Sequence, residues 1–158
     1  MYKEIELITM NSKRVGNIGE AKALSTFVEC GLPVYIPFGD NESADLVVDI
    51  NGKLCKIQCK TTSAISEQGT IIWNLRSTIV TTSNKFKTHK YTEQEVDYFV
   101  LYHTILELLL IVPIQELDGK SSISFTYPYR DVKTSPNQRN YKEYYLIDFI
   151  RRVNNQGD

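Results

Sequence analysis

ADLVVDINGKLCKIQCKTT, residues 44–62, is the stretch that decides the fold of this chain. Asn51–Gly52 is the strongest short-range signal for a two-residue β-hairpin turn. The half that follows the turn alternates polar and apolar residues, which is typical of a strand with one buried face. Side chains alternate between the two faces of a strand, so Lys56, Gln58 and Lys60 share one face.

The turn also predicts the register of the hairpin. Strands that reverse at Asn51–Gly52 place Asp45 opposite Gln58. One carboxylate, one amide and the ammonium of Lys60 then meet on one surface within a few ångströms of each other. A solvent-exposed hairpin could carry the same residues without any chemistry, so both interpretations stay open at this point.

This combination of groups suits metal-assisted cleavage of a phosphodiester. Water is barely ionised at neutral pH, and a bound Mg²⁺ ion lowers the pKa of that water. Mg²⁺ prefers hard oxygen ligands, which Asp45, the Gln58 amide and the backbone carbonyl of Cys59 could supply. Lys60 could hold the attacking water or stabilise the charge that develops on the phosphorus.

A helix is expected before the hairpin, over residues 17–30, where apolar residues recur at helical spacing. Asn17 and Glu20 have the spacing of a capping box. Glu20 therefore has two interpretations. It caps the helix, or it supplies a second carboxylate if the helix packs beside the hairpin.

The rest of the chain predicts an α+β fold with a mixed β-sheet flanked by helices. The expected strands are residues 32–38, 70–78, 96–103, 107–114 and 122–129. A basic loop is expected over residues 81–90. A closing helix is expected over residues 141–152, with Tyr144, Ile147 and Phe149 partly buried.

Length and composition place the chain among ordinary globular proteins. Its 158 residues suffice for one domain with a core. The N-terminus lacks an apolar signal core, and the apolar stretches are too short and too polar to cross a membrane. An odd count of three cysteines then predicts reduced thiols and a cytoplasmic protein. Cys55 and Cys59 share a strand face, but no second ligand pair for zinc lies nearby.

Charge is segregated along the chain although the net charge is only −1. Residues 51–90 carry seven basic side chains and one acidic one, whereas residues 91–118 carry six acidic side chains and no basic one. Basic segments could gather on one face and bind nucleic acid, although blocks in a sequence need not become patches in space. The candidates for contact with DNA are Arg14, Lys56, Arg76, Lys85, Lys87, Lys90, Arg130, Lys133 and Arg139.

The helix, the hairpin and their order together resemble the PD-(D/E)XK nuclease core. In that pattern an acid begins the second strand, and an acid and a lysine two residues apart lie on the third. Asp45 matches the first acid, Gln58 the position of the second acid and Lys60 the lysine. The resemblance covers residues 14–117 of a single domain, residues 1–158. It implies a restriction-endonuclease-like fold and Mg²⁺-dependent cleavage of double-stranded DNA, and leaves residues 118–158 for DNA contact or assembly.

Gln58 is where the chain departs from the family pattern, because an amide removes one negative charge from the metal site. A nuclease-fold module that binds DNA without cutting it would tolerate this change. The chain also resembles the PD-(D/E)XK homing endonucleases of cyanobacterial group I introns, which carry glutamine there. That likeness implies site-specific double-strand cleavage by a homotetramer, although a dimer would also provide two active sites. A Holliday-junction resolvase is the third hypothesis.

Overall fold

The computed structural model describes residues 11–157 except residues 40, 84, 118 and 131–137. Its centre is a five-stranded mixed sheet. The strand order is β1 (Val34–Tyr35), β2 (Leu46–Ile50), β3 (Lys53–Thr62), β7 (Tyr98–His103) and β8 (Leu108–Pro113). Strands β3 and β7 run parallel and the other neighbours run antiparallel. The predicted α+β class and mixed sheet are confirmed.

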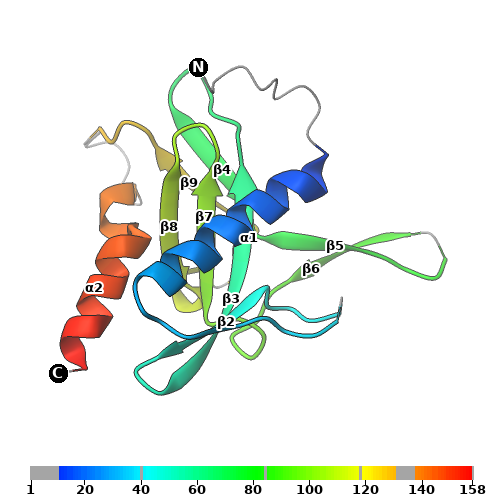
Figure 1. The fold of residues 1–158 in the computed structure, drawn as a ribbon. Coiled ribbons are helices and arrows are strands. Elements are labelled where there is room, and N and C mark those ends of the chain that lie inside the picture. Colours follow the sequence, from blue (N-terminus) through cyan, green and yellow to red (C-terminus); the bar gives the residue numbers. More distant parts are fainter. Residues whose placement is uncertain (1–10, 40, 84, 118, 131–137, 158) are drawn as a thin grey trace.

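The sheet is covered on both faces. Helix α1 (Ser12–Glu29) crosses one face, and α2 (Leu146–Gln156) lies beside β8 (Figure 1). The other face packs against a two-stranded sheet of β4 (Thr70–Asn74) and β9 (Ser122–Thr126). Two short 3-10 helices complete the body of the protein, η1 (Ile114–Leu117) and η2 (Tyr141–Tyr144).

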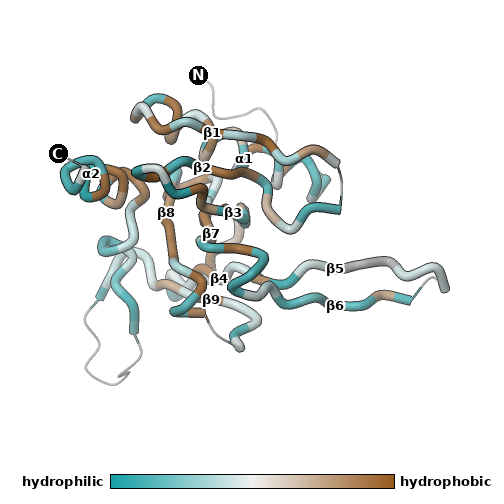
Figure 2. The backbone as a smooth tube through the Cα atoms, turned by 90° about the horizontal axis from the view of Figure 1, so that it is seen from below, coloured by the Kyte–Doolittle hydropathy of each residue, from teal (hydrophilic) through white to brown (hydrophobic). Residues whose placement is uncertain are grey.

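A two-stranded ribbon projects from this body. It consists of β5 (Arg76–Val80) and β6 (Phe86–Lys90), which pair antiparallel. We refer to residues 76–90 as the arm. Figures 1 and 2 both show it extending away from the sheet, and Figure 2 shows that most of it is polar or neutral in hydropathy.

Two apolar cores lie on opposite faces of the central sheet. On β7, Val100 packs in the core that contains Phe27 of α1, whereas Phe99 and Leu101 pack in the core that contains Trp73 of β4. A strand buried on both faces reads as a continuous hydrophobic run rather than an alternating one. This explains the run of apolar residues in β7 and β8, which Figure 2 shows in brown.

The hairpin of β2 and β3 forms as predicted. Asn51 and Gly52 both have positive φ, 54° and 83°, as a type I′ turn requires. Leu46 pairs with Ile57, so the next position outward places Asp45 opposite Gln58. The register that brings these two side chains together is therefore confirmed.

The start of α1 differs from the prediction. The helix begins at Ser12 rather than near Asn17, and its N-cap is Asn11, whose side chain accepts a hydrogen bond from the Lys13 N–H at 2.9 Å. Asparagine is a favourable N-cap at either position, and the earlier one adds helical hydrogen bonds. Glu20 consequently lies inside the helix, and the capping interpretation of this residue is wrong.

Two further predictions need correction. The strand expected over residues 70–78 is divided at Leu75, whose buried side chain separates β4 from β5. Residues 86–90, expected in a basic loop, form the second strand of the arm. In the closing helix, Leu146 and Ile150 are buried, whereas Ile147 is 39% exposed.

The described helices include none that is long and apolar enough to cross a membrane.

Candidate active site

Asp45 is fixed at the open end of the hairpin, directly before β2. Its backbone N–H donates to the carbonyl of Ile57 at 2.9 Å, and its Oδ2 accepts from the N–H of Cys59 at 2.7 Å. Within the described part of the chain, its Oδ1 accepts no hydrogen bond. One carboxylate oxygen therefore holds the strand end together while the other is available to a ligand.

Gln58 and Cys59 lie beside this carboxylate. The Gln58 side chain is only 8% exposed, and its Nε2 makes a long hydrogen bond of 3.4 Å to the Cys59 carbonyl. The N–H and C=O of one strand residue point to the same side. Since the Cys59 N–H points at Asp45, its carbonyl faces the same region. A carboxylate, an amide and a carbonyl thus converge.

Lys60 is half-buried next to this group. Its Nζ donates to the backbone carbonyl of Arg76 at 3.2 Å and lies 5.0 Å from the centroid of the Tyr91 ring. Burial lowers the pKa of Lys60, while the charge of Asp45 acts in the opposite direction. A lysine with a lowered pKa exchanges its proton more readily than a solvated one.

Glu20 reaches the site because α1 approaches β3 very closely. A Cβ built on Gly19 would lie 1.9 Å from Oγ1 of Thr61, so a larger residue would require the Thr61 side chain or the helix to shift. Burial raises the pKa of both Glu20 and Asp45, and the charge of Asp45 raises the pKa of Glu20 further. Two ionised carboxylates are therefore costly here without a cation.

These groups fit a hard divalent cation. Asp45 and Glu20 are only two acidic ligands, and no group of three His, Cys, Asp or Glu side chains that could hold a metal occurs among the described residues. Any further ligands must therefore be neutral oxygens. The donors available besides Asp45 and Glu20 are the Gln58 amide oxygen and the Cys59 carbonyl. Such an all-oxygen set suits Mg²⁺ rather than zinc, which takes nitrogen and sulfur ligands.

The site opens into a pocket of about 550 Å³. Asp45 and Gln58 line it together with the segment that leads into β2, the root of the arm, and the turn that follows the arm. A second hollow, of about 470 Å³, is lined by Glu20 and again by Asp45. Asp45 therefore borders two solvent-accessible hollows.

A sequence model described as PD-(D/E)XK endonuclease matches residues 10–147. The chain belongs to the PD-(D/E)XK endonuclease family. Its fold is also similar to that of a bacterial homing endonuclease, I-Ssp6803I, with a TM-score of 0.70. The two share 23% identity over 94% of this chain and 99% of the other. No curated protein matches. The resemblance inferred from the sequence and the restriction-endonuclease-like fold are confirmed.

The arm of this PD-(D/E)XK endonuclease carries four of the basic residues expected to contact DNA. Lys85 and Lys87 are exposed along it. Arg76 begins the arm next to Lys60, and Lys90 ends it with its Nζ donating to the Gly119 carbonyl at 2.9 Å. Four of the seven basic side chains of residues 51–90 therefore lie on the projecting arm.

The remaining candidates do not lie on the arm. Arg14 is exposed on α1, and the Lys56 ammonium donates to the carbonyl of Gln94. Arg139 donates to the Glu116 carbonyl at 3.1 Å, and Arg130 is exposed near β9. Lys133 lies outside the described residues. The four described residues lie on different segments, on α1, on β3, after β9 and before η2.

Several residues of the pocket had not been expected from the sequence: Ser43, Ser77, Thr78, His89, Tyr91 and Glu95. Most carry no local signal, because the pairing of the arm and the crossover to β7 bring them together. The exception is Glu95. It follows Thr92 at the spacing of a capping box, and its carboxylate indeed accepts from the Thr92 N–H at 2.8 Å.

Proposed function

We propose that this protein is a Mg²⁺-dependent endonuclease that cuts both strands of DNA at a specific site. The convergence of Glu20, Gln58 and Lys60 around Asp45 carries the proposal. Two carboxylates with raised pKa values favour a bound cation, and the half-buried lysine lies beside them. The likeness in fold to a homing endonuclease supports a sequence-specific DNA substrate.

Each residue has a distinct role in this proposal. Glu20, Asp45, the Gln58 amide oxygen and the Cys59 carbonyl hold the metal. When bound, Mg²⁺ lowers the pKa of coordinated water and offsets charge on the phosphate. Lys60 orients the attacking water and donates a hydrogen bond to the phosphate oxygens as their charge grows. Its contacts with Arg76 and Tyr91 hold its ammonium in place before the substrate arrives.

The arm is the element best suited to recognise the DNA. A two-stranded β-ribbon fits the major groove of B-DNA, which is about 12 Å wide. Lys85 and Lys87 could contact phosphates on either side of that groove, and such contacts supply affinity that weakens as salt is added. Because the arm is rooted at the pocket, DNA held on it lies near Asp45.

Cleavage of both strands requires two active sites, and each chain supplies one. A symmetric homo-oligomer follows, because closed symmetry places two equivalent sites on the two antiparallel strands of DNA. We favour a tetramer, and a dimer would satisfy the same requirement.

Gln58 favours one other function, that of a DNA-binding module without catalysis. The test is to incubate the protein and Mg²⁺ with fragmented genomic DNA and to sequence the ends produced, with Lys60→Met as the control. We expect one discrete cut site for the parent and none for the variant. DNA binding without any Lys60-dependent ends would indicate the binding module. Cleavage of four-way junctions alone would indicate a resolvase.

A further inference from the structure

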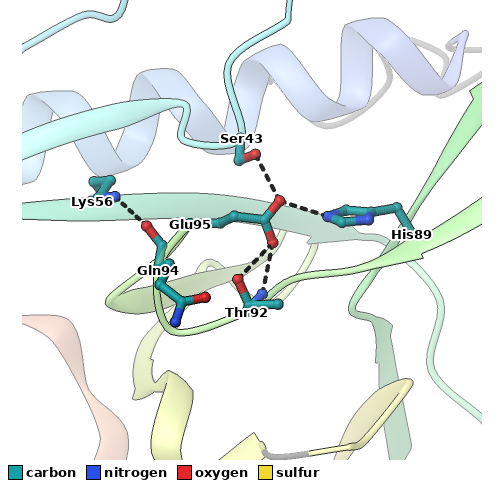
Figure 3. Close-up of polar contacts among 6 residues, drawn as sticks. All are labelled: Ser43, Lys56, His89, Thr92, Gln94 and Glu95. Carbon is teal, nitrogen blue, oxygen red and sulfur yellow. Dashed lines mark hydrogen bonds and ion pairs between the residues drawn. The ribbon is translucent and has the colours of Figure 1, made fainter.

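Glu95 lies at the centre of a polar cluster that the proposed chemistry does not use (Figure 3). Its Oε1 accepts from the Ser43 hydroxyl at 3.3 Å and lies 2.8 Å from Nε2 of His89. Its Oε2 accepts from both the backbone N–H and the hydroxyl of Thr92, at 2.8 and 3.0 Å. Both oxygens of the carboxylate are therefore engaged.

These partners come from three separate segments. Ser43 lies two residues before Asp45, His89 is on β6 at the root of the arm, and Thr92 is in the turn between the arm and β7. One carboxylate thus ties the arm to the segment that delivers the first acid of the site. Burial raises the pKa of Glu95, but the hydrogen bonds from Thr92 and His89 outweigh it and hold the pKa below its usual value.

The same turn is attached to the catalytic strand. The Lys56 ammonium donates to the Gln94 carbonyl, as Figure 3 shows, and the Lys56 N–H donates to Oδ2 of Asp97 at 2.8 Å. Lys56 lies two residues before Gln58 on β3. The turn between β6 and β7 is therefore attached to the arm through His89, to the segment before β2 through Ser43, and to β3 through Lys56.

Few other contacts among the described residues hold the arm in place. An isolated two-stranded hairpin is at best marginally stable in water, so its direction depends on its root. In the described chain, the polar contacts between that root and the rest of the protein include the Glu95 cluster, the Arg76 N–H with Oδ1 of Asn74, Lys60 with the Arg76 carbonyl, and Lys90 with the Gly119 carbonyl. Of these contacts, the Glu95 cluster alone also reaches the segment leading to Asp45.

We propose that Glu95 is a positioning residue that fixes the arm relative to Asp45 and Gln58, so that DNA bound by the arm meets them in register. The inference rests on the proposed function. It does not make Glu95 a catalytic residue, because both of its oxygens already bind the protein. A misplacement of about 1 Å can lower a rate by about 100-fold, so the attachment of the arm matters for cutting more than for binding.

The test is Glu95→Gln, which keeps the size of the side chain. It removes the charge and replaces one acceptor with a donor, so the side chain can no longer accept from Thr92 on one side and from Ser43 and His89 on the other. We expect DNA affinity in Ca²⁺ to stay within about threefold, because every lysine of the arm is retained. The single-turnover cleavage rate at saturating protein in Mg²⁺ should fall by about tenfold or more.

The matched control is Glu93→Gln, an equal change of charge in the same turn. Glu93 is exposed, and its carboxylate makes no hydrogen bond or ion pair within the described part of the chain. This variant should match the parent in affinity and rate. His89→Gln should resemble Glu95→Gln, and combining the two should cost less than the product of their separate losses.

Hydrogen exchange of the arm amides gives a readout that does not depend on cleavage. Amides of residues 76–90 should exchange faster in Glu95→Gln than in Glu93→Gln, while those of β7 stay protected. Unchanged exchange in the arm, or a cleavage rate equal to that of the parent, overturns the inference. If the parent binds DNA but cuts none, the proposed function fails, and the exchange experiment still decides whether Glu95 anchors the arm.

Discussion

Gln58 is the residue at which this chain departs from its family pattern, and it gives the sharpest test of the metal site. Gln58→Glu keeps an oxygen donor and adds a negative charge beside Asp45 and Glu20. The mutant should bind the metal more tightly, because attraction between opposite charges is strong in a partly buried site. We expect half-maximal cleavage at a lower Mg²⁺ concentration, measured by metal titration of the cleavage rate.

The matched control at this position is Gln58→Leu, which keeps a similar volume and has no donor. It should lose most of its activity at every Mg²⁺ concentration. Cleavage by Gln58→Leu at the parent rate in low Mg²⁺ would rule out Gln58 as a ligand. Activity in Gln58→Glu but not in the parent would favour the DNA-binding module.

The buried negative charge of Asp45 should lower the free energy of unfolding of the metal-free protein at neutral pH. Burial raises its pKa, and the hydrogen bond from Cys59 and the charge of Lys60 only partly oppose this. The folded protein therefore keeps the Asp45 proton to higher pH than the unfolded chain does. Consequently the free energy of unfolding falls as the pH rises from the unfolded pKa to the folded pKa.

Asp45→Asn should therefore melt at a higher temperature than the parent at neutral pH without metal, and the difference should vanish in acid. Asparagine has no charge to bury and keeps an oxygen that can accept from Cys59. Mg²⁺ should raise the melting temperature of the parent only, because a ligand stabilises the fold that binds it. Equal stabilisation of both proteins by Mg²⁺ would place the metal elsewhere.

At the scale of elements, the crossing of α1 over β3 positions Glu20, and the two glycines of α1 provide a matched pair to test it. A Cβ at Gly19 would overlap Thr61, whereas a Cβ at Gly16 would have no neighbour within 4 Å. Gly19→Ala should destabilise the protein by about 1–3 kcal/mol through overpacking. Gly16→Ala should stabilise it by up to about 1 kcal/mol, because alanine is the better helix former.

Thermal unfolding measures both effects, and the Mg²⁺ titration shows whether Glu20 moves. Gly19→Ala should need more Mg²⁺ for cleavage, because the helix must shift away from the strand that carries Gln58. Gly16→Ala should need the same amount as the parent. If Gly19→Ala were as stable as the parent, α1 would not pack as closely on β3 as the structure has it.

The elements that the sequence predicted well are those with local signals. Asn51–Gly52 determines both the turn and the register, so the sequence alone places Asp45, Gln58 and Lys60 on one surface. The start of α1 was missed because Asn11 and Asn17 are equally good caps, and only tertiary contacts choose between them. The second strand of the arm, Phe86–Lys90, was missed because most of its side chains are exposed, so it lacks the hydrophobic period on which strand prediction depends.

At the scale of the whole molecule, the segregation of charge proved more informative than the net value. The basic block of residues 51–90 contains both β3 and the arm, whereas several acids of the next block act as internal partners. Glu95 anchors the arm, Asp97 accepts from Lys56, and Glu116 pairs with Arg139 at 3.9 Å. Such pairings depend on chain crossovers, and no spacing in the sequence predicts them. Of the residues that line the pocket, the sequence therefore predicted those of the β2–β3 hairpin, Asp45 and Gln58, but not those of the arm and the turn that follows it.

The need for two active sites gives the last prediction. If the protein acts as a symmetric oligomer, an assembly that mixes parent and Lys60→Met subunits can cut one strand at a site but not both. The variant keeps the arm and therefore binds DNA. It loses only the ammonium, whose charge acts on the transition state. Parent and variant subunits, co-expressed with different tags and purified through both, should convert a supercoiled plasmid carrying the target mainly to nicked circles.

The parent alone should give linear plasmid under the same conditions, and the variant alone should give neither product. Size measurement by light scattering would show whether the doubly tagged species is a dimer or a tetramer. If the assembly is a tetramer and only two of its subunits cut the DNA, those two are both parent chains in some of the mixed tetramers. These tetramers would still make linear product. A doubly tagged sample that yields linear plasmid as fast as the parent would mean that one subunit cuts both strands in turn. The symmetric arrangement would then be wrong.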